Sequence, residues 1–168
     1  MQIKDQSLVL GHFKGAPIRF HWSILLGMFY FGGLEFAPGF WLGFCFLILC
    51  HELGHGLLVA MYGLKINDIV VHGFGGHCEW LGHTGKTQRS VIAWGGVLAQ
   101  ALLFLAISVY LWTAGAPSSP LWRDFAHVMT STNLLLIAIN LIPIPPLDGA
   151  QAWLLFPRLF SGKSSRMR

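Results

Sequence analysis

The sequence predicts an all-α polytopic membrane protein with about four transmembrane helices, a short membrane-associated β-hairpin and a C-terminal interfacial helix. Of the 168 residues, 54% are hydrophobic and only 11% are charged, whereas about 25% are charged in an ordinary soluble domain. The apolar residues also gather in long runs. Too few polar side chains remain to cover a soluble protein of this size, so we expect one integral membrane domain at residues 1–160.

Four apolar runs approach or reach the length that a bilayer-spanning helix needs. They cover residues 20–36, 40–62, 89–112 and 122–142. Pro143 must end the last run, because proline cannot continue a helix. Beyond this break, we expect an interfacial helix at residues 150–160 and a basic disordered tail at residues 161–168.

Two parts of the chain have extended rather than helical character. Near the N-terminus, residues 7–13 and 16–20 flank Lys14-Gly15 and predict a pair of strands. Between the second and third runs, residues 65–72 and 78–81 flank a glycine-rich turn at residues 73–76. This strand, turn and strand pattern predicts a β-hairpin that lies at the membrane face or dips into it.

The basic side chains indicate the orientation in the membrane. Of the eleven Lys and Arg residues, ten fall on one side of a four-span arrangement and only Arg123 falls on the other. Loops rich in Lys and Arg remain in the cytoplasm, so we expect both termini there, in a multi-pass protein of the plasma (inner) membrane. The positive net charge therefore reflects membrane topology, and we expect the lipid bilayer, and no nucleic acid, as a partner.

Three ionisable residues, His51, Glu52 and His55, interrupt one of the most apolar runs. A charged side chain at the bilayer centre costs about 2.5–3.5 kcal/mol or more, so such residues usually mark a functional site. On a helix, His51 and His55 share one face and can hold one metal ion, while Glu52 can reach a water beside it. This is the His-Glu-x-x-His pattern of zinc metalloproteases. The alternative is two polar positions that face a neighbouring helix and a water.

A catalytic zinc usually has three protein ligands, so this pattern requires one more. Asp148 is the best candidate, because it follows the proline break near the expected depth of His55. Its alternative role is the N-cap of the interfacial helix. Glu79, in the predicted hairpin, is the rival third ligand. Asn140, one turn before the break, is expected to bond either freed backbone groups or a substrate.

Together, His51-Glu52-Leu53-Gly54-His55 and the segment from Asn140 to Gly149 resemble the site-2 protease family of intramembrane zinc metalloproteases. The resemblance covers most of the chain, including residues 15–22 and 74–76. It implies that His51, His55 and Asp148 bind one Zn²⁺ per chain and that Glu52 is the catalytic acid/base. It also implies an endopeptidase that cuts transmembrane protein substrates within or near the bilayer, in regulated intramembrane proteolysis.

The chain also departs from this family. The family often has Gly-Pro and a following Asn in its middle helix, where this sequence reads Gly96-Val97-Leu98-Ala99-Gln100, so no role follows for Gln100. A length of 168 residues predicts a near-minimal catalytic core without a regulatory domain.

The glycine hairpin offers a strand edge on which an extended substrate can pair. Gly75, Gly76 and Asn140 are therefore the expected substrate-binding residues. A second metal site is an alternative reading of His72, His77, Cys78 and His83, although their spacing matches no standard zinc pattern. A catalytically silent membrane metal-binding scaffold or transporter is the alternative function. Zinc binding without cleavage would indicate it. The sequence indicates neither the substrate nor the oligomeric state.

Overall fold

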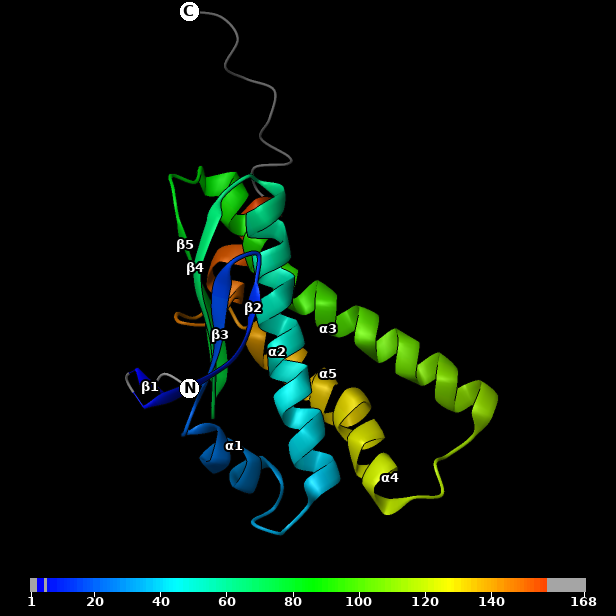
Figure 1. Cartoon of the computed structure of the whole chain (residues 1–168). Helices are drawn as coiled ribbons and strands as arrows, with labels where there is room; N and C mark the ends of the chain where they lie inside the picture. Colours follow the sequence, from blue (N-terminus) through cyan, green and yellow to red (C-terminus); the bar gives the residue numbers. More distant parts are fainter. Residues whose placement is uncertain (1–2, 5, 157–168) are drawn as a thin grey trace, which may run out of the picture.

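The computed structural model of the chain describes residues 3–4 and 6–156 (Figure 1). Five strands form one sheet in the order β1-β2-β3-β4-β5. They are β1 (Ile3–Lys4), β2 (Ser7–Phe13), β3 (Ala16–His21), β4 (Lys65–His72) and β5 (Gly75–Leu81). The two strand pairs expected from the sequence are thus present.

The two hairpins belong to one sheet because β3 and β4 pair in parallel, with Phe20 opposite Val71. The other neighbouring strands are antiparallel. Lys14 and Gly15 join β2 to β3 with φ angles of 50° and 86°, as a two-residue hairpin turn requires. The sheet therefore joins chain segments that are separated in sequence by two helices.

The helical part begins with α1 (Ile24–Phe31) and the long α2 (Pro38–Met61), which starts on a proline, a residue favoured in the first turn of a helix. The second long helix is α3 (Lys86–Ala114). The remaining helical segments are α4 (Pro120–His127), a π-helical turn (Val128–Thr132), α5 (Asn133–Asn140) and the four-residue α6 (Gly149–Ala152).

The prediction of an all-α fold with four transmembrane helices is wrong. The chain combines a mixed sheet with helices, and among the described residues only α2 and α3 are long and apolar enough to cross a membrane. The first apolar run fails because its start at Phe20 pairs with β4, which leaves α1 only eight residues. The last run, although helical from Pro120 to Asn140, is divided by the π-helical turn.

The expected C-terminal interfacial helix is only partly within the described residues. Helix α6 ends at Ala152, and residues 157–160 lie outside the described part of the chain. The basic tail at residues 161–168 also lies outside it.

Helix α2 lies between the sheet on one side and helices α3, α4 and α5 on the other (Figure 1). On the sheet side, Val71 of β4 packs in a buried cluster with Phe44 and Leu47 of α2. Further along the helix, Ile69 and Val59 belong to a second buried cluster, which also includes Ile92 of α3. This packing fixes α2 from both sides.

Helices α2 and α3 cross with their backbones in contact. A Cβ on Gly54 would collide with the carbonyl oxygen of Gly95, and a Cβ on Gly95 would collide with the backbone of Gly54. Small residues permit this close approach between helices in a membrane. Beyond the crossing, the C-terminal part of α3 diverges from α2 (Figure 1).

Candidate metal centre

His51 and His55 lie one turn apart on α2, and their side chains face each other. Their Nε2 atoms are 3.1 Å apart, and the ring planes are nearly perpendicular at 82°. Both residues are buried, with 7% of each exposed. The local helix therefore brings two imidazole nitrogens to one point, as the i, i+4 spacing predicts.

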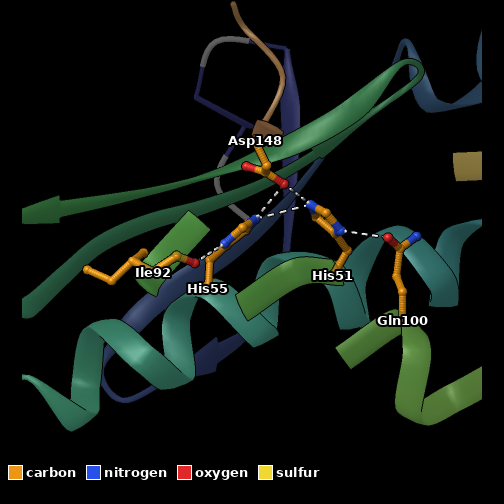
Figure 2. Close-up of polar contacts among 5 residues, drawn as sticks. All are labelled: His51, His55, Ile92, Gln100 and Asp148. Carbon is orange, nitrogen blue, oxygen red and sulfur yellow. Dashed lines mark hydrogen bonds and ion pairs between the residues drawn. The ribbon is translucent and has the colours of Figure 1, made fainter. Parts of the chain in front are cut away.

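Asp148 reaches the same point from the segment between α5 and α6. Its Oδ2 atom lies 3.0 Å from Nε2 of His51 and 3.2 Å from Nε2 of His55 (Figure 2). One ligand atom from each residue falls within 4.8 Å of the others. Among the described residues, this is the one group of three or more His, Cys, Asp or Glu side chains with that geometry.

The outer nitrogen of each histidine has a hydrogen-bond partner on α3 (Figure 2). Nδ1 of His55 lies 2.7 Å from the carbonyl oxygen of Ile92, and Nδ1 of His51 lies 3.0 Å from Oε1 of Gln100. Because both partners are acceptors, each Nδ1 carries the proton and donates it. Each Nε2 is then left with a lone pair, which is the state in which imidazole binds a metal.

This arrangement fits a metal ion. Two lone pairs and a carboxylate face one another at short distance, and no other described residue donates a hydrogen bond to Oδ2 of Asp148. A cation between these three atoms would satisfy all of them. Two imidazole nitrogens and one carboxylate oxygen match the ligand set of a catalytic zinc that keeps one position open.

Glu52 lies beside this group but is not part of it. Glu52 is 2% exposed, and its Oε2 atom has no hydrogen-bond partner in the described part of the chain. A Cβ on Gly76 of β5 would come within 2.6 Å of Oε1 of Glu52, so the glycine leaves the space that the carboxyl group occupies. Glu52 therefore keeps one buried carboxylate oxygen without a hydrogen-bond partner among the described residues.

A cavity of about 600 Å³ opens onto the site. Apolar side chains line part of it, and polar side chains line the rest. The apolar group includes Phe31, Phe44, Ile48, Phe74, Leu136 and Ile139, and the polar group includes His72, His77, Arg89, Asn140 and Gln151. The three expected substrate-binding residues, Asn140, Gly75 and Gly76, all line this cavity.

Among the described residues, the rival ligands do not join this group. Glu79 is exposed, and its carboxylate accepts a hydrogen bond from Asn67 at 2.7 Å. His72 and His77 have ring centroids 6.3 Å apart and do not join a three-ligand group within the described part of the chain. Burial, together with the Glu52 carboxylate, raises the pKa of the Cys78 thiol to about 12, which keeps it protonated at neutral pH.

Sequence reasoning missed most of the residues that support the ligands. Ile92 acts through its carbonyl oxygen, and Gly96 leaves room for the His51 ring, with which a Cβ would collide. Asn133 is fully buried, and its side-chain NH₂ donates to the carbonyls of Gln100 and Met129. The available signals were weak: a polar Gln100 and a polar Asn133 within apolar runs.

Comparison with known proteins points to one group. A family model described as Peptidase M50B-like matches residues 40–147, which is more than half of the chain. A protein of Mycobacterium tuberculosis named Putative zinc metalloprotease Rip3 is 30% identical, over 86% of this chain and 42% of that protein. Stage IV sporulation protein FB of Bacillus subtilis is 29% identical, over 67% of this chain and 38% of that protein.

An archaeal relative and a solved structure extend this comparison. Zinc metalloprotease MJ0392 of Methanocaldococcus jannaschii is 26% identical, over 88% of this chain and 44% of that protein. The chain thus spans less than half the length of these curated relatives. The solved Site-2 Protease from Methanocaldococcus jannaschii has a similar fold, with a TM-score of 0.67 at 24% identity, over 94% of this chain and 73% of that one.

Proposed function

Because the chain belongs to the Peptidase M50B-like family, we propose that it is an intramembrane zinc-dependent endopeptidase. It would hydrolyse peptide bonds within or near transmembrane segments of membrane proteins, from a single catalytic unit within residues 1–160. One observation carries this proposal above the others. The Nε2 atoms of His51 and His55 and Oδ2 of Asp148 converge, and the free carboxylate oxygen of Glu52 lies next to them.

In this proposal His51, His55 and Asp148 hold one Zn²⁺ per chain. When bound, zinc supplies a Lewis acid that polarises a carbonyl group and makes water a stronger nucleophile at neutral pH. The hydrogen bonds from His51 to Gln100 and from His55 to Ile92 keep both Nε2 lone pairs directed at the metal. Asp148 supplies negative charge that offsets the charge of the cation.

Glu52 moves the proton. Its Oε2 atom has no hydrogen-bond partner among the described residues, so it can accept a proton from the attacking water as the oxygen–carbon bond forms. It then returns that proton to the leaving nitrogen as the carbon–nitrogen bond breaks. Proton transfer by a placed side chain typically contributes about 10²–10⁴-fold to a rate.

A substrate segment has to lose its helical hydrogen bonds before its backbone reaches Glu52. Strand β5 lies at the edge of the sheet, and Gly75 and Gly76 on this strand line the cavity. We therefore place an extended segment of the substrate along β5, where main-chain groups can pair. Its apolar side chains would face the apolar part of the cavity wall, and Asn140 would contact its backbone.

This placement can be tested by cross-linking. A photoreactive amino acid at position 74 of a Glu52→Gln chain should cross-link to a membrane protein substrate, because Phe74 is 71% exposed and lines the cavity. The same group at position 112, which is 86% exposed on α3, is the control. Equal labelling from both positions would contradict substrate binding along β5.

The orientation follows from the basic residues. The end of the molecule that carries Lys65, Lys86 and Arg89 would face the cytoplasm, in a plasma (inner) membrane. Two apolar helices of sufficient length support residence in a membrane.

The decisive experiment separates metal binding from chemistry. Glu52→Gln should retain about one zinc per chain and lose about 10²–10⁴-fold in proteolytic rate. Stoichiometric loss of zinc from this variant would contradict the role of Glu52. Mass spectrometry of membrane proteins retained by the inactive chain would identify substrates. A parent chain that holds one zinc yet cleaves no membrane protein would favour a metal-binding scaffold or transporter instead.

A further inference from the structure

The segment that carries Asp148 has little regular structure of its own. Residues 141–148 form only turns and bends, and three of them are prolines, which lack a backbone N–H to donate. Helix α6, which follows, has four residues. Nevertheless, Oδ2 of Asp148 lies within 3.2 Å of two imidazole nitrogens. Besides the short-range backbone hydrogen bonds of this segment, contacts with the rest of the chain therefore help to fix its position.

Two indole N–H groups hold the two ends of the segment that carries Asp148. Nε1 of Trp153 donates to the carbonyl oxygen of Leu141, just beyond the end of α5, at 2.6 Å. Nε1 of Trp94, on α3, donates to the carbonyl oxygen of Ala152, the last residue of α6, at 3.0 Å. The two indole rings contact each other edge to face, with centroids 5.5 Å apart. Carbonyl groups at helix ends need such donors where water is scarce.

The packing between these ends is also tight. A Cβ on Gly149 would collide with the carbonyl oxygens of Leu141 and Ile142. The residue after Asp148 therefore rests directly on the backbone at the end of α5. A side chain at position 149 would therefore push α6, and with it Asp148, away from the end of α5.

Helix α3 thus supports all three ligands. Ile92 accepts the hydrogen bond from His55, Gln100 accepts the one from His51, and Trp94 lies between them in sequence. The two histidines lie on α2, and the aspartate lies in a different segment of the chain. Both segments contact α3, and Trp94 is the residue of α3 that bonds the segment carrying the aspartate.

We propose that Trp94 and Trp153 are positioning residues of the metal centre. Their N–H groups clamp the 141–152 segment so that Oδ2 of Asp148 meets His51 and His55. This inference rests on the proposed function, since it requires that these three side chains bind zinc. The competing explanation is that both tryptophans only anchor the chain at the membrane interface. In that case the aromatic ring matters and its hydrogen bond to a particular carbonyl does not.

Phenylalanine substitutions separate the two explanations. Trp94→Phe and Trp153→Phe keep an aromatic ring and remove the N–H donor. We expect each variant of the full chain to bind zinc about 10-fold more weakly, the lower end of the loss seen when groups supporting metal ligands are removed. Zinc affinity would be measured by competition with a chelator, well below the unfolding temperature of each variant. Trp112→Phe is the control, because Trp112 is 86% exposed at the far end of α3.

The outcomes are distinct. A parent chain that binds no zinc would overturn the proposed function. A parent chain that binds zinc, with both Phe variants at the parental affinity, would overturn the clamp alone. The clamp would also be overturned if Trp94→Phe and Trp153→Phe lost only as much zinc affinity as Trp112→Phe.

A second measurement needs no substitution. If the clamp favours the zinc-bound arrangement, zinc must favour the closed clamp to the same extent, because coupling between two equilibria is reciprocal. In the ¹⁵N-labelled parent chain, removal of zinc by a chelator should accelerate hydrogen exchange at the indole N–H groups of Trp94 and Trp153. The Trp112 indole should not change. Unchanged exchange at Trp94 and Trp153 would refute the coupling.

Discussion

Nδ1 of His51 lies 3.0 Å from Oε1 of Gln100, although the two residues are 49 positions apart and belong to different helices. Gln100 is 1% exposed, so this hydrogen bond is shielded from water. It directs the other nitrogen of the imidazole ring toward Asp148 (Figure 2). The polar residue that the sequence left without a role thus supports a metal ligand.

The first prediction concerns this contact. Gln100→Met keeps the size of the side chain and removes the acceptor, so the His51 ring loses the bond that fixes its orientation. We expect zinc affinity to fall about 10–100-fold, as measured by chelator competition. Gln151→Met is the matched control, because Gln151 is exposed at the cavity. Parental affinity in Gln100→Met would show that the bond does not contribute to the site.

The second prediction sets Asp148 against Glu79 as the third ligand. Asp148→Asn should abolish proteolysis and weaken zinc retention, since two imidazoles alone leave the charge of the metal poorly compensated. Glu79→Gln should keep the zinc content of the parent chain, because its carboxylate is exposed and bonded to Asn67. Metal analysis of the two purified variants checks this. The reverse pattern would require the site to be rebuilt around the hairpin.

The third prediction tests the contact between the two long helices. In Gly54→Ala the new methyl group collides with the carbonyl of Gly95 and with Ala99. Overpacking of this kind costs about 1–3 kcal/mol, so we expect a lower unfolding temperature in detergent. Gly11→Ala is the control, because a Cβ there has no neighbour within 4 Å. Equal unfolding temperatures for both variants would mean that the two helices accommodate the added methyl group without a loss of stability.

The fourth prediction concerns orientation. Reporters inserted in the 82–85 loop, before α3, and in the 115–119 loop, after it, should lie on opposite sides of the membrane. The first should be cytoplasmic, because Lys86 and Arg89 begin α3. Reporter activity on the same side from both loops would exclude α3 as a spanning helix.

Local patterns in the sequence predicted the local structure well. The i, i+4 spacing of His51 and His55 correctly indicated a shared helix face, and the glycine turn at residues 73–76 correctly indicated a hairpin. The family resemblance, which was based on the helix motif and Leu147-Asp148-Gly149, is confirmed.

Long-range relationships were not predictable in the same way. The parallel pairing of Phe20 with Val71 joins strands with no common local signal, and it shortens a run that composition alone assigns to a spanning helix. Similarly, the hydrogen bond of Gln100 to His51 depends on where two helices cross. The π-helical turn at Val128–Thr132 divides a run that hydropathy treats as uniform.

The contact between Gly54 and Gly95 also has a mechanical consequence. Gln100 lies five residues from Gly95 along α3, about 7.5 Å, and Trp112 lies seventeen residues away, about 25 Å. For a given rotation of α3 about the contact, Trp112 would therefore travel roughly three times as far as Gln100. Ile92 and Gln100, which support the histidines, therefore lie close to the point where such a rotation would be centred, and the splayed end of the helix would carry most of the displacement.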